Sequence, residues 1–291
     1  MNVGTCYITV EHDPAAQRVN GLQPDEGYFA ATSSNARQMF WEAENALQPA
    51  VSHNKPRSSS TVEALSTFRI DHRPELLAAC YRLRYQVYCV ERAFLSPTDY
   101  RDEIEVDEFD RHAWHFATVD SFGNVLATAR LVLPSILGLP LFRHCTLFSD
   151  EHEPHKPAHS VVEVSRLSMS RQVRTPGSRL VQSGSVTGSM GLRDAVTYSL
   201  YRALYHASKR AGFTHWLVAT EASLQRAVRA YAFPFRPIGP PIDYFGPVTP
   251  YLMNLSVFDR VVLDGTMPRL NGFLDGLEQR YHPQAMLSAS A

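Results

Sequence analysis

Two charged side chains interrupt a β-rich run near the middle of the chain, Val161–Met169. Successive side chains of a strand point to opposite faces, so we expect Glu163 and Ser165 on one face and Arg166 on the other. A charge in a central strand is costly to bury unless it is paired, and residues retained at such a cost are often functional. A carboxylate in this position could act as a general base and remove the proton from an ammonium group.

Arg130 is a second charge of this kind, because it lies within the apolar run Leu126–Val132. One interpretation is a site in which arginine and carboxylate act on a substrate. The other is that Arg130 or Arg166 forms a buried ion pair with Glu163 and only fixes the register of the strands. The residues alone leave both interpretations open.

An acidic loop, Asp102–Asp110, supplies further polar candidates. On its own, the run Asp107-Glu108-Phe109-Asp110 is typical of a solvated turn. Beside Arg84, Arg130 and Glu163 it indicates a polar cluster that recognises a zwitterionic or amine substrate. Arg84 shares a helix face with three tyrosines, which is unusual for a solvated surface: Tyr81, Tyr85 and Tyr88.

Other reactive side chains give weaker signals. The four cysteines contain no C-x-x-C pair, which argues against a zinc site or a disulfide framework and favours reduced thiols. A nucleophilic role for Cys80 or Cys89 is less favoured than a structural one, because both fit a helix as small apolar residues. The loop 151–159 has three histidines and two glutamates, but two prolines interrupt it, so we predict no metal site.

Composition and charge narrow the class of protein. The chain is 44% hydrophobic and 20% charged, as globular proteins are, and its net charge of -1 gives no general attraction to nucleic acid. The N-terminus lacks a basic start followed by an apolar run, and no window approaches the roughly 20 apolar residues of a membrane span. We therefore expect a cytoplasmic protein with no nucleic-acid partner.

The elements that would position these residues change type along the chain. A strand, a helix, three strands, a helix, a strand, a helix and two strands follow one another, which favours a mixed α+β sheet with one parallel portion. Strands are predicted at 67–70, 114–119, 125–133, 160–170 and 216–220 and twice within 235–262, and helices from Pro74, from an Asp194 cap to Gly212, and over 223–230.

Three segments are distinguished by composition. Residues 1–62 are predicted to be an N-terminal extension, partly disordered, with a short helix over 34–47. Residues 63–265 carry the periodic pattern and are predicted to form the domain. Residues 266–291 are predicted to be a C-terminal tail.

Four short motifs follow one another along the chain: Arg84-Tyr-Gln-Val-Tyr88, Asp107-Glu-Phe-Asp110, Ala129-Arg130-Leu131 and Glu163-Val-Ser165-Arg166-Leu167. In this order they resemble the signature of the acyl-homoserine-lactone synthases, R-x-x-V-F, D-x-F-D, R-L and E-x-S-R. Tyr88 stands in place of the phenylalanine, and Phe94 in place of a tryptophan. The longer stretch Leu83–Leu95 is more similar to the acyltransferases associated with PEP-CTERM/exosortase systems, relatives of the N-acyl amino acid synthases.

The resemblance covers roughly residues 67 to 260 and implies a GNAT-like acyltransferase fold with a mixed central sheet flanked by helices. It implies an acyl donor on the phosphopantetheine of acyl carrier protein, an amino-acid acceptor and no other bound cofactor. The lipid product would associate the protein peripherally with the inner membrane. By resemblance, Glu163 would be the catalytic or amine-positioning acid, with Arg84 and Arg130 catalytic, and the substrate-binding residues would be Tyr88, Phe94, Asp107, Asp110, Ser165 and Arg166.

The loop after the Glu163 strand bears on the choice of donor. GNAT enzymes that use coenzyme A cradle its pyrophosphate with Q/R-x-x-G-x-G/A at a helix start. Here Arg174-Thr-Pro-Gly177-Ser-Arg179 keeps only the first half, since Arg179 replaces the second glycine. A carrier protein has one phosphate and an acidic surface, which suit a basic patch, although a solvated loop fits as well. The carrier-binding candidates are Arg171, Arg174, Arg179 and Arg193.

Three other functions are weighed against this one. Phe94 in place of tryptophan, and the longer chain, argue against a lactone synthase that uses S-adenosylmethionine. The incomplete cradle argues against a coenzyme A-dependent N-acetyltransferase. The intact charged set argues against a non-catalytic domain that binds an acyl carrier or lipid. The sequence does not select the amino acid, since tyrosine and glutamine both fit.

Overall fold

A twisted sheet of eight strands forms the centre of the protein. The computed structural model describes residues 61–62, 64–149, 158–176, 179–180, 191–244 and 246–283. Along the sheet the strands follow the order β2 (Leu65–Arg69), β3 (Ala113–Asp120), β4 (Val125–Val132), β5 (Val161–Met169), β7 (His215–Thr220), β10 (Pro247–Asn254) and β8 (Arg236–Pro237), with β9 (Ile242–Asp243) also paired to β10.

The strand directions give the fold its class. β5 and β7 are parallel, whereas the other neighbours in this sheet are antiparallel. The predicted mixed α+β sheet with one parallel portion is therefore confirmed. A separate parallel pair joins β1 (Thr61–Val62) to β6 (Arg179–Leu180).

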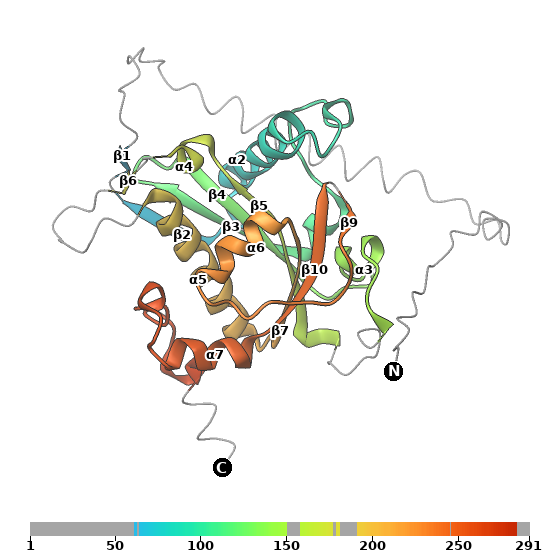
Figure 1. The fold of residues 1–291 in the computed structure, drawn as a ribbon. Helices are drawn as coiled ribbons and strands as arrows, with labels where there is room; N and C mark the ends of the chain where they lie inside the picture. Colours follow the sequence, from blue (N-terminus) through green and yellow to red (C-terminus); the bar gives the residue numbers. More distant parts are fainter. Residues whose placement is uncertain are drawn as a thin grey trace. The chain divides into compact units, whose positions relative to one another are not determined.

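Helices cover the sheet on both sides (Figure 1). α5 (Leu192–Ala211) contacts β2, β3 and β4 through a stripe that includes Val196, Leu200 and Leu204, all fully buried. α2 (Pro74–Tyr85) packs over β3, β4 and β5 and continues into a π-helical turn, η2 (Gln86–Glu91). The shorter helices are α3 (Pro140–His144), α4 (Arg171–Arg174), α6 (Ala222–Arg229) and α7 (Leu255–Leu263), and the 3-10 turns are Pro97–Asp99, Glu108–His112, Ala158–Ser160, Pro268–Leu270 and Gln279–Tyr281.

The predicted helix bounds are partly right. Pro74 begins α2, and Gly212 ends α5 in the left-handed conformation with φ 75°. The predicted cap at Asp194 is wrong, because α5 begins two residues earlier with Gly191 as its cap. Asp194 instead lies in the first helical turn, where a carboxylate is favoured by the helix dipole.

Of the two strands predicted within 235–262, the structure shows β10 as the long one, with the two-residue β8 and β9 beside it. Residues 255–262 are instead helical, since α7 follows β10 directly. The Asn254 side chain accepts a hydrogen bond from Ser256 N at 2.8 Å and so caps the helix. Leu255 and Phe258, three residues apart, both face the core.

Residues 266–283, predicted as the start of a tail, pack against α5. Tyr198 Oη donates to Asn271 O at 2.8 Å, and Phe273, which is 1% exposed, contacts the rings of Tyr198 and Tyr205. The C-terminal part of the chain therefore contributes to the core beneath α5.

Several predictions lie outside the described residues, namely the helix over 34–47, most of the N-terminal extension, and His152 and His155 of the histidine-rich loop. Among the residues that the structure does describe, no helix is both long enough and apolar enough to cross a membrane.

Candidate active site

A bulge in β5 changes where its side chains point. Arg130 of β4 is paired with Ser165, but Thr128, two residues earlier, is paired with Ser168, three residues later. One extra residue is thus accommodated in β5, and Arg166 takes the left-handed conformation with φ 53°. The expectation that Arg166 faces away from Ser165 is wrong, because both side chains join the same polar network.

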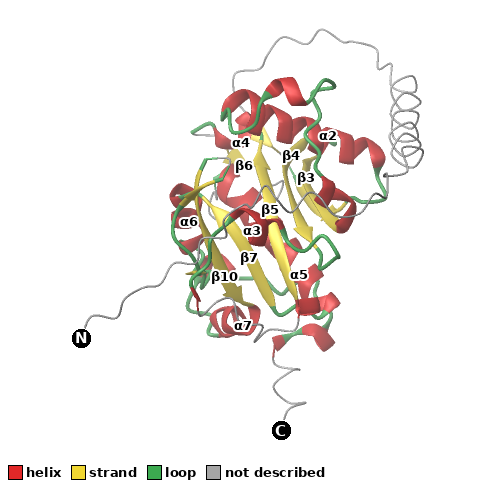
Figure 2. Cartoon of the chain, turned by 90° about the vertical axis from the view of Figure 1, so that its right-hand side faces the viewer, coloured by secondary structure: helices red, strands yellow, loops and turns green. Residues whose placement is uncertain are grey.

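β5 and β7 part immediately beside this bulge. Their pairing runs only from Val161 to Glu163 on β5 and from His215 to Leu217 on β7. Beyond it lies a cavity of about 280 Å³, lined by both strands, by η2 and by the start of α5. Figure 2 shows the two strands side by side with α3 next to them. The edges of β5 and β7 that face this cavity carry backbone groups without a strand partner in the described part of the chain.

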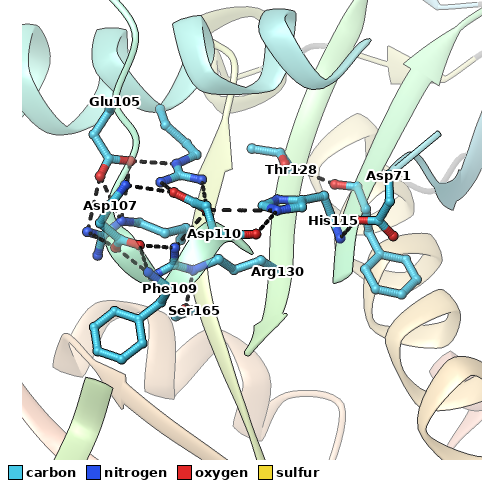
Figure 3. Close-up of polar contacts among 12 residues, drawn as sticks. Asp71, Glu105, Asp107, Phe109, Asp110, His115, Thr128, Arg130 and Ser165 are labelled. Atoms are coloured by element: carbon cyan, nitrogen blue, oxygen red, sulfur yellow. Dashed lines mark hydrogen bonds and ion pairs between the residues drawn. The ribbon is translucent and has the colours of Figure 1, made fainter. Parts of the chain in front are cut away.

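Three arginines and three carboxylates form a buried network beside the cavity (Figure 3). Their charges, three positive and three negative, sum to zero. The members come from α2, from the segment before β3, from β4 and from β5: Arg84, Glu105, Asp107, Asp110, Arg130 and Arg166.

Arg84 ties α2 to the acidic segment. Its Nη1 and Nη2 donate to Asp110 Oδ1 and Oδ2 at 2.7 and 2.9 Å, and its Nε donates to Glu105 Oε2. Burial alone would raise the pKa of Asp110, but Arg84 and Arg130 outweigh it and hold that pKa well below its usual range. The same two carboxylates hold the pKa of Arg84 well above its ordinary value despite burial. Both groups are therefore ionised throughout the physiological range.

Arg130 and Arg166 complete the network from the sheet. Arg130 Nη1 donates to Asp107 Oδ1 at 2.6 Å and Asp110 Oδ1 at 2.7 Å, and its Nε donates to Ser165 Oγ at 3.0 Å. Arg166 donates to Asp107 Oδ2 at 2.8 Å and to Glu105 Oε1 at 3.1 Å. Figure 3 shows Arg130 between the two aspartates, with His115 beyond Asp110. The network fastens the acidic segment onto the sheet.

Glu105 is a member that sequence reasoning missed. It is fully buried and binds two guanidinium groups, whereas Asp102 and Glu103 in the same acidic loop are exposed. A signal for it exists in the sequence, because Glu105 is the one carboxylate of that loop with apolar residues on both sides, Ile104 and Val106.

Glu163 lies on the cavity wall outside this network. It is 2% exposed, and its Oε2 accepts a hydrogen bond from Leu141 N of α3 at 2.7 Å. In the part of the chain that the structure describes, neither Arg130 nor Arg166 forms an ion pair with it, so the alternative of a buried Glu163–arginine pair is not what the structure shows. Burial raises the pKa of Glu163 to about 7, although the Leu141 N–H and the two arginines act in the opposite direction.

Aromatic side chains form one side of the cavity. Tyr88 Oη donates to Leu167 O at 3.2 Å, and its ring lies 6.3 Å from the ring of Phe94. Phe94 packs against the backbone of Gly246, where an added Cβ would come within 2.6 Å of the ring. Gly246 also has φ 101°, so glycine is suited to this position in both respects.

Charged side chains surround the mouth of the cavity. Arg92 forms an ion pair with Glu221, and Arg174 forms one with Glu91. Arg193, in the first turn of α5, is exposed and also lines the cavity. Arg92 is a basic residue that sequence reasoning did not single out.

The structure divides the predicted site residues into groups. Arg84, Asp107 and Asp110 lie behind the cavity within the network. Arg171 is exposed on α4, and Arg179 lies in β6 opposite Thr61. Those that line the cavity are Tyr88, Phe94, Arg130, Glu163, Ser165, Arg166, Arg174 and Arg193.

Part of the chain matches a known protein family. Residues 83–181 match the family model described as acetyltransferase (GNAT) domain. No curated protein matches the sequence. Among solved structures, the chain is similar to the coenzyme A-dependent acyl-homoserine lactone synthase BjaI with S-adenosylmethionine and isopentyl-CoA, at 18% identity and TM-score 0.49, covering 76% of this chain and 100% of that one.

Two further solved structures are similar. The acyl-homoserine lactone synthase LasI has 18% identity and TM-score 0.47, with 66% of this chain and 89% of that chain covered. FeeM, an N-acyl amino acid synthase from uncultured soil microbes, has 13% identity and TM-score 0.45, with 68% and 93% covered.

Proposed function

We propose that this N-acyltransferase, whose residues 83–181 match the acetyltransferase (GNAT) domain family, transfers a long-chain fatty acyl group from acyl carrier protein to the α-amine of an amino acid. The observation that carries the proposal is Glu163, a buried carboxylate on the cavity wall beside a network whose own charges already balance.

The acyl acceptor is inferred from the negative charge of Glu163. An ammonium group in the cavity would give Glu163 the positive partner that the described arginines do not supply. The amine must then lose a proton before it can attack a thioester. A carboxylate whose pKa lies near 7 is well matched to take that proton at neutral pH.

The acyl donor is inferred from the place where β5 and β7 part. A phosphopantetheine arm is an extended chain with amide groups, which can hydrogen-bond to the facing edges of β5 and β7 where those strands part. Its single phosphate would meet the basic mouth of the cavity at Arg174 and Arg193, with Arg92 beside them. Arg171 and Arg179 are proposed as further contacts for an acidic carrier protein.

The remaining roles rest on the four ordered motifs. Arg130, Ser165 and Arg166 are proposed to shape the acceptor pocket together with Tyr88 and Phe94, and Arg84, Asp107 and Asp110 to hold them in place. The resemblance further suggests a protein that works beside PEP-CTERM/exosortase systems. A carrier-protein partner would place it in the cytoplasm, and an amphiphilic product would bring it to the inner membrane.

Mass spectrometry of lipid extracts tests this function. Cells that express the chain should accumulate long-chain N-acyl amino acids, and the fragment ions should identify both the acceptor and the chain length. Cells that express Glu163→Gln should accumulate far less. Extracts that contained acyl-homoserine lactones, or no new acyl amide at all, would contradict the proposal. Equal products from wild type and Glu163→Gln would remove Glu163 from the mechanism.

A further inference from the structure

Tyr201 of α5 is a cavity residue whose hydroxyl has no partner within the described part of the chain. Its side chain is 3% exposed, and its ring packs on the rings of Trp216 and Phe233, with centroids 6.3 and 4.9 Å away. The hydroxyls one turn to either side are occupied. Thr197 donates to Arg193 O at 2.7 Å, and Tyr205 donates to an aspartate of α7 at 2.5 Å.

The hydroxyl of Tyr201 opens on the cavity. Among the described residues, the polar side-chain atoms that are both enclosed and unpaired belong to Ser168, Ser170 and Gln225. Tyr201 is not one of these, so its unpaired oxygen is accessible, and the cavity is the accessible space that Tyr201 lines. Burial raises the pKa of Tyr201 above its ordinary value, so the phenol keeps its proton. A ligand that offers it an acceptor gains a hydrogen bond.

Tyr201 and Glu163 approach the cavity from opposite faces of the sheet. Tyr201 shares an apolar core with Val162 and Val164 of β5. Glu163 alternates with these two valines and accepts its hydrogen bond from Leu141, which belongs to the other core. The cavity therefore passes between β5 and β7 where the strands part.

α5 leads from the mouth of this cavity to its closed end. Arg193, Thr197 and Tyr201 follow one another at four-residue spacing, so they share one helix face, and all three line the cavity. Arg193 is exposed, whereas the other two are buried. Tyr201 packs on Trp216, which lies where β7 is still paired with β5. Eight residues of helix place Tyr201 about 12 Å inward from Arg193.

The phosphopantetheine arm carries an anion and an acceptor at a matching separation. From its phosphate to the carbonyl of the amide nearest the thiol there are about nine covalent bonds, or roughly 11 Å when the arm is extended. A phosphate at Arg193 would bring this carbonyl to Tyr201. The thioester would then lie just beyond, between the parting strands, where an amine bound to Glu163 meets it from the other face.

We propose that Tyr201 is a donor-binding residue, whose hydroxyl donates to the carbonyl of the amide nearest the thiol of phosphopantetheine, with the phosphate at Arg193. This inference rests on the proposed acyl transfer and names the part of the donor that the α5 side of the cavity recognises. The contact sets the depth to which the arm enters, and so places the thioester at the level of Glu163.

Two small thioesters isolate the amide. The N-acetylcysteamine thioester of a fatty acid keeps it, whereas the pentanethiol thioester has methylene groups in place of its NH and C=O. With an amino-acid acceptor, Tyr201→Phe should lower kcat/KM by roughly 5–20-fold for the first thioester and by less than about twofold for the second. Comparing the variant with wild type on each donor cancels any difference in the intrinsic reactivity of the two thioesters.

Matched variants separate this contact from a structural effect. Tyr201→Phe removes no hydrogen bond within the described protein, so its thermal midpoint should equal or exceed that of wild type. Tyr205→Phe removes the hydroxyl that donates to Asp259 Oδ1, so it should lower the thermal midpoint and treat both thioesters alike. Arg193→Ala should keep wild-type kcat/KM with both, because neither carries a phosphate.

Calorimetry with 4′-phosphopantetheine gives a readout that needs no transfer. Tyr201→Phe and Arg193→Ala should each weaken its binding by roughly 5–20-fold. If Tyr201→Phe binds it as wild type does, or loses kcat/KM equally with both small thioesters, the assignment of Tyr201 is wrong. A loss confined to thioesters of hydroxylated fatty acids would place the hydroxyl on the acyl chain and overturn the assignment as well.

Failure of the proposed function gives a different result. If wild type binds 4′-phosphopantetheine and Tyr201→Phe weakens that binding, but no acyl group reaches an amino acid, the proposed function is wrong and the assignment of Tyr201 is correct. If wild type transfers the acyl group but does not bind 4′-phosphopantetheine, the assignment is wrong and the function is correct. If wild type does neither, both proposals fail.

Discussion

Glu163 is set apart from the other carboxylates near it by the groups that contact it. Glu105, Asp107 and Asp110 each contact at least two guanidinium groups, whereas Glu163 receives one backbone hydrogen bond from α3. The difference is visible in the directions of their pKa values, since that of Asp110 is held down by arginines and that of Glu163 is raised by burial. Neighbouring carboxylates thus have separate tasks.

The first prediction at this scale concerns pH. The kcat/KM for acyl transfer should rise as pH increases through about 7, because only the ionised Glu163 can take a proton. Glu163→Gln should lose this rise and lower kcat/KM at pH 8 by roughly 10²–10⁴. Initial rates measured between about pH 5.5 and 9 provide the test. A flat wild-type profile would rule out Glu163 as the base.

Ionisation of Glu163 should lower the stability of the folded protein as pH rises, whereas it raises kcat/KM. A carboxylate whose folded pKa is raised binds its proton more tightly in the native state, so native stability is lost as pH rises from the ordinary glutamate value through about 7. Glu163→Gln should therefore be more stable than wild type at pH 8, by up to about 3 kcal/mol, and not at pH 4. Urea unfolding at both pH values measures this. A variant less stable than wild type at pH 8 would be inconsistent with an uncompensated charge.

A third residue-scale prediction concerns the network. Glu105→Gln should lower the free energy of unfolding by about 3–5 kcal/mol, since it leaves Arg84 and Arg166 short of a buried partner. Glu108→Gln is the control, because Glu108 is exposed and its ion pair with Arg143 should contribute less than about 1 kcal/mol. If both variants lost the same free energy of unfolding, the ion pairs of the buried network would contribute no more to stability than an exposed ion pair.

The sequence predicted most network members and missed one. Arg130 and Arg166, and Glu163 outside the network, were identifiable because a charge within an apolar strand breaks the apolar pattern of that strand. Glu105 lies in a loop, where no periodicity exists to be violated, and its burial follows from long-range contacts with α2 and β5. The arginine partners could not be assigned from sequence either, because the bulge moves Arg166 to the other face.

Among elements, the parting of β5 from β7 creates the cavity, and the contact between Phe94 and the β9–β10 turn bounds it. Alternation of side chains between the two faces of a strand predicts the directions of the β5 side chains up to Ser165. It fails at Arg166, because no sequence feature indicates that this arginine takes the left-handed backbone conformation. α7 was missed, because two strands and no helix were predicted within 235–262. Its valines favour β-structure locally, while the Asn254 cap and packing of Phe258 favour the helix.

Gly246→Ala tests the boundary of the cavity. The substitution should cost about 1–3 kcal/mol of stability beyond any backbone strain, because its Cβ would meet the Phe94 ring at 2.6 Å. Gly265→Ala is the matched control, since Gly265 is also left-handed but has nothing within 4 Å of the added Cβ. Thermal or urea unfolding compares the two. Phe94→Ala combined with Gly246→Ala should recover the excess loss, and a failure to do so would place the clash elsewhere.

For the molecule as a whole, the fold class was easier to predict from the sequence than the C-terminal boundary of the folded domain. The α+β class and the acyltransferase assignment could be predicted from element order and from the four motifs. The packing of residues 266–283 on α5 could not, because turns with few apolar residues have no periodicity that indicates burial.

The prediction at this scale concerns that C-terminal segment. Phe273→Ala should lower the free energy of unfolding by about 3–5 kcal/mol, because the ring is fully buried among Tyr198, Tyr205 and Phe258. Phe122→Ala, at a position 83% exposed in the β3–β4 turn, should change it by less than about 0.5 kcal/mol. A small effect at Phe273 would mean that the segment is peripheral to stability.

The charge-balanced network also restricts how this protein can diverge. Each guanidinium group binds a carboxylate from another element of the chain. A single substitution in the network therefore leaves a buried charge without its partner. Substitutions at Arg84, Asp110 and Arg130 should therefore be accepted only in compensating sets, and descendants should either keep all six residues or replace several at once. The cavity walls outside the network are free of this linkage, so the choice of substrate can evolve by single steps while the framework beneath it stays constant.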